Sequence, residues 1–209
     1  MKVPFAPPRM DQRVIDEVAD TLLSGWITTG PKTKKFEKLL TAYCNVPNVL
    51  ALNSATAGLE IMLRWFGVKE GDEVILPAYT YSATANVVIH CGAKPVFVDV
   101  GDDFNILPSE IENAINKNTK VIMPVDFGGL PCDFQKVNNI FQSENIKNKF
   151  VPATDVQQQL GRILVLSDAA HSFGATVNNI KTGALTDVSV FSFHAVKNLT
   201  TGEGGAIAL

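Results

Sequence analysis

The chain has 209 residues, of which 46% are hydrophobic, and it carries 18 Lys and Arg against 21 Asp and Glu. This length and apolar content suit one α/β domain with a sizeable core. A net charge of −3 gives no basic field for nucleic acid, and no apolar run reaches the ~20 residues of a membrane helix. Because the start, MKVPFAPPRMDQ, does not resemble a signal peptide, we expect a cytoplasmic protein without a nucleic-acid or membrane partner.

Two amphipathic helices are predicted ahead of the first strand, one of them over residues 11–24. Their apolar residues recur at helical spacing: Val14, Val18 and Leu22, then Phe36, Leu39 and Leu40. Seven apolar, β-branched runs follow and are predicted to be strands: 49–53, 73–77, 95–99, 120–125, 162–167, 187–193 and 204–209. Helical patterns between them indicate crossover connections and a mostly parallel sheet covered on both faces. The polar segment 143–161 is expected to be an irregular excursion before the fifth strand.

Cysteine and histidine spacing gives no sign of a metal site. Three cysteines are far apart without any CxxC pair, and three histidines show no paired ligand spacing. We therefore expect buried free thiols and no metal.

Ligands of open α/β sheets collect beyond the carboxyl ends of the strands, so the residues at those ends are candidates for a site. The first strand is followed by NSATAG (53–58), whose small residues and Thr hydroxyl at a helix N-terminus suit a phosphate group. The same stretch is explained if Asn53 or Ser54 merely caps the helix.

Three further strand ends carry polar or aromatic residues. Tyr79 and Tyr81 follow the second strand, where an aromatic face can stack on a planar ligand, although tyrosines are common at such positions. Asp168 and His171 follow the fifth, and the aspartate could instead cap a helix. Lys197 follows the sixth within SFHAVKNLTTGEGG, and a lone lysine is usually a solvated surface charge.

These candidates together match what pyridoxal phosphate (PLP) requires. Its aldehyde needs a lysine for a Schiff base, and its pyridine nitrogen needs an acidic partner. Its phosphate needs small residues and hydroxyls, and its ring a flat neighbour. The combination favours a functional role for Lys197 over a surface charge.

The same motifs resemble the DegT/DnrJ/EryC1/StrS family of sugar aminotransferases over nearly the whole chain. The motifs, in the family's order, are SGWITTGPK, NSATAG, GDEVILPAYTYSATAN, GAKPVFVDV, SDAAHS and SFHAVKNLTTGEGG. The resemblance implies the large domain of a type I PLP-dependent transferase (aspartate aminotransferase-like), an α/β fold with a mostly parallel seven-stranded sheet between helices. It also implies these roles: Lys197 bonding PLP and moving protons, Asp168 on the pyridinium nitrogen, His171 near the ring oxygen or supporting the ring's orientation, Thr56, Ala57 and Ser192 on the phosphate, and Tyr81 stacking on the ring.

The reaction implied by the resemblance moves an amino group from glutamate, which leaves as 2-oxoglutarate, to a nucleotide-linked keto sugar. SATAG and SFHAVKN are most similar to enzymes that aminate C4 of a UDP-linked 4-keto sugar for aminosugar or cell-surface polysaccharide biosynthesis. Relatives with histidine at the lysine position dehydrate sugars instead, and Lys197 argues against that branch. The family also implies a homodimer.

Length is where the chain departs from the family pattern. Relatives continue into a smaller C-terminal domain, so we expect residues 1–209 to be the N-terminal segment plus the PLP-binding large domain of a longer enzyme. The alternative is a catalytically inactive remnant that keeps the fold and part of a dimer surface.

Overall fold

The computed structural model describes residue 3 and residues 7–209. A sheet of seven strands runs through it in the order β1-β9-β8-β5-β4-β2-β3. The strands are β1 Val49–Leu52, β2 Glu73–Pro77, β3 Lys94–Val98, β4 Thr119–Ile122, β5 Leu164–Asp168, β8 Val188–Ser192 and β9 Gly205–Ala208. In this seven-stranded sheet of the described residues, β9 is antiparallel to both neighbours and the other pairings are parallel. The predicted strands and the mostly parallel sheet are therefore confirmed.

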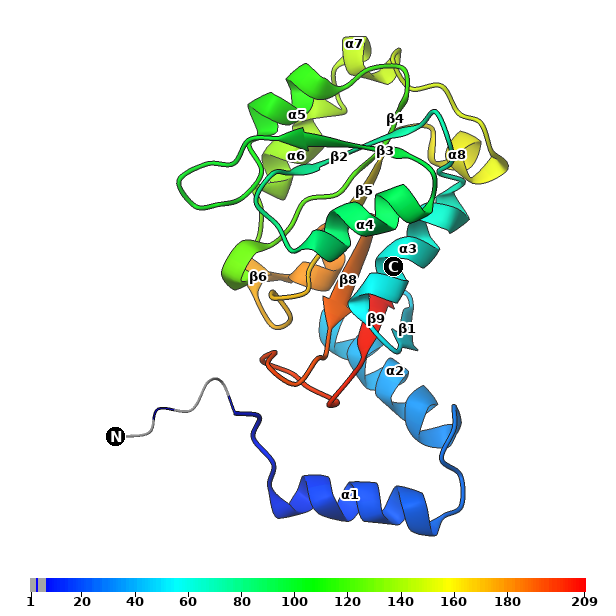
Figure 1. The fold of residues 1–209 in the computed structure, drawn as a ribbon, viewed down its shortest axis with the longest axis vertical. Helices are drawn as coiled ribbons and strands as arrows, with labels where there is room; N and C mark the ends of the chain where they lie inside the picture. The colour runs from blue at the N-terminus through cyan, green and yellow to red at the C-terminus, as the bar shows by residue number, and fades with distance from the viewer. Residues whose placement is uncertain (1–2, 4–6) are drawn as a thin grey trace.

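Helices cover both faces of the sheet, with α3 and α4 on one and α5 and α6 on the other (Figure 1). The helices are α1 Gln12–Leu23, α2 Pro31–Cys44, α3 Ala55–Phe66, α4 Ser82–His90, α5 Pro108–Ala114, α6 Phe134–Ile140, α7 Glu144–Lys147 and α8 Asp155–Leu160. Among the residues described, no helix has both the length and the apolar character needed to cross a bilayer.

A small hairpin was not predicted from the sequence. It consists of β6 (Thr176–Val177) and β7 (Ile180–Lys181), joined by Asn178 and Asn179. Both asparagines have positive φ, 50° and 65°, as the two central residues of a type I′ turn require. The dipeptide Asn-Asn was thus a readable turn signal, but two-residue strands are too short to show an alternating pattern.

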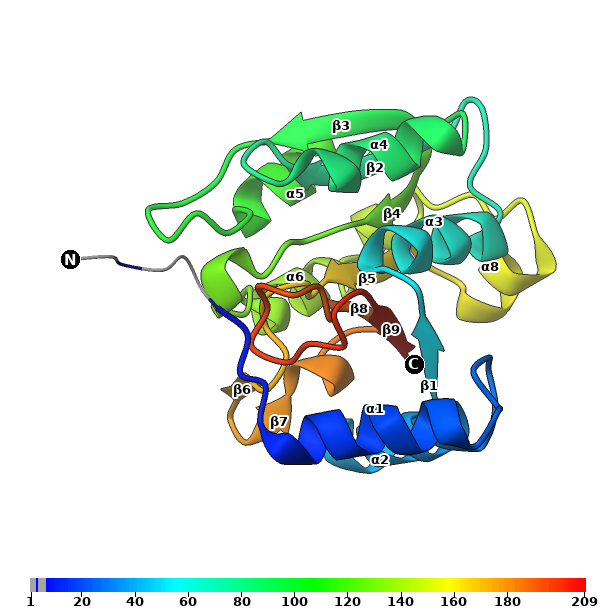
Figure 2. The same cartoon turned by 60° about the horizontal axis from the view of Figure 1, so that its bottom comes forward.

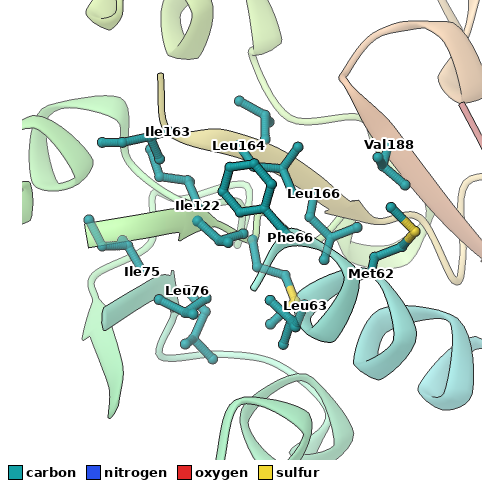
Figure 3. Close-up of a cluster of buried hydrophobic side chains, with 14 of the residues drawn as sticks. Met62, Leu63, Phe66, Ile75, Leu76, Ile122, Ile163, Leu164, Leu166 and Val188 are labelled. Carbon is teal, nitrogen blue, oxygen red and sulfur yellow. The ribbon is translucent and has the colours of Figure 1, made fainter. Parts of the chain in front are cut away.

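The main core lies between α3 and the middle of the sheet. Met62, Leu63 and Phe66 point from α3 toward side chains of β2, β4, β5 and β8, with Met62 next to Val188 (Figure 3). Phe66 is completely buried, and burying a side chain of that size contributes about 1.5–3 kcal/mol. All residues of β4, β5 and β8 are buried, as expected for central strands covered on both faces.

A second core cluster lies under α2. Successive residues of β8 face opposite sides, so Val190 packs toward α3 while Phe191 packs against Leu40 and Cys44 of α2. On the α3 side, a Cβ built on Gly58 would lie 2.8 Å from a methyl carbon of Val190, so glycine permits the helix to approach the sheet. Cys44, like Cys91 and Cys132, is buried and free, as predicted.

Helix α1 forms as predicted, but its apolar face packs against no core. Val14, Val18 and Leu22 are 40%, 55% and 63% exposed, and no residue of the helix is buried. The helix lies away from the centre of the sheet and is joined by a loop to the start of α2 (Figures 1 and 2). Lys32 of α2 pairs with Asp20 of α1 at 2.7 Å. The amphipathic pattern therefore leaves an apolar strip open to solvent.

The segment 143–161 is more regular than predicted. It contains α7 and α8, and Gln157 of α8 is fully buried, with its side chain donating to the Phe66 carbonyl at 2.8 Å and accepting from the Ala153 amide at 2.9 Å. Lys120, also buried, donates to the Val151 carbonyl. The segment looked irregular in the sequence because polar side chains, Gln157 and Lys120, hold α8 and the loop before it in place.

Candidate active site

The carboxyl ends of the parallel strands meet at one edge of the sheet, and a cavity of about 590 Å³ lies there. It is lined by residues from three turns: Gly128 and Gly129 after β4, His171 to Ala175 after β5, and Val196 to Asn198 after β8. Two of the predicted site residues, Lys197 and His171, therefore share one cavity.

Lys197 lies in the turn that follows β8, and its backbone amide donates to the His194 carbonyl at 2.9 Å. The residue is partly buried. Burial lowers the pKa of its ammonium group, and the nearby charge of Asp168 opposes that shift. A lysine with a lowered pKa spends more time as the neutral amine, which is the form that attacks a carbonyl.

Asp168 is the last residue of β5 and is 6% exposed. Its carboxylate accepts a hydrogen bond of 2.9 Å from the Thr84 hydroxyl and one of 3.3 Å from the Ala170 amide. Burial raises its pKa, whereas both hydrogen bonds and the charge of Lys197 lower it. The residues after it form turns, not a helix, so helix capping does not explain this aspartate.

His171 lies on the cavity wall three residues after Asp168. Burial lowers the pKa of its imidazole, and the positive charge of Lys197 lowers it further, so the ring is neutral at pH 7. Its carbonyl oxygen lies close to Gly129, where an added Cβ would be only 3.0 Å from it. Gly129 also has a φ of +90°, so this contact between two walls requires glycine.

The predicted phosphate-binding stretch lies at the N-terminus of α3. Ser54 caps the helix by accepting from the Ala57 amide at 3.1 Å, which is the capping role left open by the sequence. Thr56 is exposed on the first turn, where the leading amides of a helix lack intrahelical partners. Such a helix end still attracts an anion through its dipole and free N–H groups.

Gly205 brings Ser192 close to this helix end. It pairs with Ser192 of β8 on one side and with Leu52 of β1 on the other. A Cβ built on Gly205 would lie 2.5 Å from the Ser54 carbonyl carbon and 2.6 Å from the Ala55 nitrogen. The absence of a side chain therefore allows β9 to lie directly against the turn that precedes α3.

The two candidate tyrosines have different surroundings. Tyr79 packs with Phe104 and Phe127, with ring centroids 5.3 and 5.1 Å away, and so belongs to a local aromatic cluster. Tyr81 precedes α4 and is 79% exposed. Neither tyrosine lines the cavity, and neither do Thr56, Ala57 and Ser192.

Three residues of the site were missed by sequence reasoning: Thr84, Asp126 and Ser172. Thr84 lies within α4, and nothing in its local pattern marks it as a partner of Asp168. Asp126 comes directly after the fourth predicted strand, so the rule applied to the other strand ends would have found it. Ser172 is buried and bonds to Asp126, a contact that only the fold creates.

Comparison with known proteins finds one family and several related structures. The DegT/DnrJ/EryC1/StrS aminotransferase family matches residues 8–148 and 153–209. Spr1654 of Streptococcus pneumoniae, provisionally assigned as a sugar aminotransferase and solved in its PLP form, is 45% identical, with a TM-score of 0.96 over 100% of this chain and 53% of its own. The spore coat polysaccharide biosynthesis protein SpsC of Bacillus subtilis is 38% identical over 98% of this chain and 49% of its own. DesI, solved with its TDP-sugar product, is 29% identical, with a TM-score of 0.82 over 99% of this chain and 48% of its own.

The chain belongs to the DegT/DnrJ/EryC1/StrS aminotransferase family. It spans about half the length of the relatives that it matches. Its α/β fold is the one found in the PLP-dependent sugar aminotransferases of this family.

Proposed function

We propose that the protein is a PLP-dependent aminotransferase that transfers an amino group to a sugar. The observation that carries the proposal is the placement of Lys197 in one cavity with His171 and near enough to the buried Asp168 carboxylate for each to shift the other's pKa. The family match supports it, as do the PLP and PMP forms of the S. pneumoniae relative.

The donor set fits PLP. Lys197 would bond the aldehyde through Nζ, and Asp168, fixed by Thr84, would accept from the protonated pyridine nitrogen. The N-terminus of α3, with Thr56 and Ala57, would hold the phosphate together with Ser192, and Tyr81 and His171 would lie against the ring. When bound, the cofactor supplies an electron sink for the substrate carbon and carries the amino group between substrates.

The residues of the chain supply proton transfer and charge. Nζ of Lys197 would move a proton between the substrate carbon and the cofactor, and its lowered pKa favours the neutral amine that accepts such a proton. Burial raises the pKa of Asp168, and the hydrogen bonds from Thr84 and the Ala170 amide, together with the charge of Lys197, oppose that rise. A protonated pyridine nitrogen facing this carboxylate would favour its ionised form, and the carboxylate would in turn hold the proton on that nitrogen. The imidazole of His171, whose pKa is lowered, would orient the PLP ring without adding a second positive charge to the site.

The donor in this proposal is glutamate, which leaves as 2-oxoglutarate, and the acceptor is a nucleotide-linked keto sugar. DesI, with its TDP-sugar product, and SpsC, named for polysaccharide biosynthesis, support an acceptor of this class. Amination at C4 of a UDP-4-keto sugar rests on the SATAG and SFHAVKN motifs. The competing proposal is a remnant that keeps the fold without turnover.

A cytoplasmic homodimer is part of the proposal. The exposed apolar strip of Val14, Val18 and Leu22 on α1 supports association, because such a strip is stabilised when another surface covers it. The molar mass of the full-length protein in solution, measured by light scattering, tests this assembly.

The activity is tested by incubating the full-length protein with PLP, glutamate and a panel of nucleotide-linked keto sugars, with products identified by mass spectrometry. An amino sugar from one member of the panel, together with 2-oxoglutarate, is the expected result. Lys197→Ala is the matched control and should give neither product. A wild-type protein that neither turns yellow with PLP nor forms an amino sugar would favour the remnant.

A further inference from the structure

Asp126 is a buried carboxylate that has no part in the chemistry described above. It lies just beyond β4, is 1% exposed, and its backbone amide donates to the Asp168 carbonyl at 3.2 Å. Val125, the residue before it, forms a bridge with Asp168. Burying a carboxylate is unfavourable unless hydrogen bonds compensate for lost water, so its partners indicate what it stabilises.

Both oxygens of the Asp126 carboxylate accept hydrogen bonds, from two different turns. Oδ2 accepts from the Ser172 hydroxyl at 2.6 Å, and Oδ1 accepts from the Cys132 amide at 3.0 Å. Ser172 belongs to the turn after β5, and Cys132 to the turn after β4. A single buried carboxylate therefore joins these two turns.

The same two turns both line the cavity that contains Lys197. Gly128 and Gly129 line it from the first turn, and the segment from His171 to Ala175 lines it from the second. The Gly129 amide donates to the Asp126 carbonyl at 3.2 Å, and Gly129 touches the His171 carbonyl closely. The position of one wall relative to the other thus depends on Asp126.

Ser172 is held on its other side as well. Its carbonyl accepts from the Thr182 hydroxyl at 2.8 Å, and the Thr182 carbonyl accepts from the Ser189 hydroxyl at 2.9 Å. All three residues are buried. The hydrogen bonds from Ser189 to Thr182 and from Thr182 to Ser172 restrict the position of Ser172. The bond between Ser172 and Asp126 therefore fixes the turn that carries His171 relative to Asp126.

We propose that Asp126 is a positioning residue of the cofactor site, which fixes the turn of His171 against the turn of Gly128 and Gly129 and so holds His171 in place for PLP. The inference rests on the proposed function in one respect, that PLP is the ligand. Asp126 acts through Ser172 and the backbone of Asp168, and it touches no reacting atom.

The test measures two properties of the full-length protein with PLP. The first is the dissociation constant from fluorescence titration, and the second is the pH midpoint of the bound cofactor's visible absorbance. Asp126→Ala removes both hydrogen bonds, whereas Asp126→Asn can keep them, by accepting from the Cys132 amide and donating to the Ser172 hydroxyl. Asp72→Asn is the matched control, because Asp72 is a buried carboxylate before β2 that bonds to the Lys69 amide.

We expect Asp126→Ala to weaken PLP binding about tenfold or more and to shift the absorbance midpoint, while Asp126→Asn stays within about threefold of wild type. Asp72→Asn should leave both properties unchanged. Ser172→Ala should weaken binding in the same direction as Asp126→Ala, and it decides the matter if circular dichroism shows Asp126→Ala to be unfolded. Thr119→Val, which removes a buried hydroxyl that accepts from the Asn116 amide at the start of β4, serves as its control.

Wild-type affinity and an unshifted midpoint in folded Asp126→Ala, or in Ser172→Ala if the first variant does not fold, would overturn the inference and leave the proposed function standing. An equal loss in Asp72→Asn would also overturn it, since any buried carboxylate would then have the same effect. A wild-type protein that does not bind PLP would overturn the proposed function, and the inference with it.

Discussion

Thr84 donates a hydrogen bond of 2.9 Å to Oδ2 of Asp168, joining helix α4 to the end of β5 across 84 residues of sequence. Thr84 is fully buried, and its hydroxyl also lies 2.7 Å from the Thr80 hydroxyl. The bond lowers the pKa of Asp168 against the effect of burial. A helix that covers the sheet thereby helps to keep the central carboxylate of the site charged and in place.

Replacing Thr84 with valine should weaken PLP binding without unfolding the protein. Thr84→Val keeps the shape of the side chain but removes the donor, and a buried acceptor left unsatisfied costs about 1–3 kcal/mol. Part of that free energy should appear as a higher PLP dissociation constant, measured by titration. Thr119→Val is the matched control, because Thr119 is equally buried and its hydroxyl bonds to the Asn116 amide. Equal PLP affinity in the two variants would contradict the role of Thr84.

Asp168→Asn should retain some cofactor but lose most of the amino transfer. The amide has nearly the shape of the carboxylate and can still accept from Thr84, but it carries no charge to hold a proton on the pyridine nitrogen. Single-turnover rates of the full-length enzyme, compared at saturating PLP, measure the effect. Transfer by Asp168→Asn at the wild-type rate would refute the assignment.

Asp126 should make the stability of the cofactor-free protein depend on pH. Burial raises its pKa from 3.8 to about 6, so the folded state holds a proton that the unfolded state releases between those values. The raised pKa contributes about 3 kcal/mol to the free energy of unfolding at low pH. This contribution is complete below pH ~4 and is lost as pH rises through about 6.

Asp126→Asn lacks that titration and so isolates it. Urea denaturation at several pH values measures the free energy of unfolding of both proteins. Between pH ~4 and ~7, wild type should lose about 3 kcal/mol of this free energy relative to Asp126→Asn. Contributions from Asp168 and other carboxylates are common to both proteins and largely cancel. A difference that does not vary with pH would show that the Asp126 pKa is not raised.

Gly205→Ala should displace the N-terminus of α3, which we propose binds the phosphate of PLP. The added methyl would lie 2.5 Å from the Ser54 backbone, which cannot move aside as a side chain can, and such overpacking costs about 1–3 kcal/mol. Lower melting temperature and weaker PLP binding should appear together. Gly101→Ala is the control, because its added methyl would meet only the side-chain ends of Asp103 and Leu107, at 3.2 and 3.3 Å. Unchanged PLP binding in Gly205→Ala would show that the contact between Gly205 and the N-terminus of α3 has no role in binding PLP.

The strands and the carboxyl edge of the sheet were predictable because they follow from local patterns. Apolar, β-branched runs located all seven strands of the main sheet, and the polar residues after them led to Lys197, Asp168 and His171. The structure places Lys197 and His171 on one cavity, with Asp168 close enough to influence the pKa of Lys197.

Other features depend on contacts that no local pattern contains. The bond of Thr84 to Asp168 joins residues far apart in the chain, and the helix of Gln157 is anchored by the Phe66 carbonyl, 91 residues away. The apolar face of α1 was correctly read as helical, but periodicity alone does not tell which surface covers it. Asp126 is different, because its position after a predicted strand was visible in the sequence.

The central claim, that Lys197 is the residue that bonds PLP, is tested most directly by borohydride reduction of the full-length protein incubated with PLP, followed by peptide mapping. We predict a single stable adduct on the peptide that contains Lys197, and none in folded Lys197→Ala. Lys94→Ala, which removes an exposed lysine at the start of β3, should be labelled as wild type is. An adduct on another lysine of the wild-type protein, or undiminished labelling of Lys197→Ala, would contradict the account.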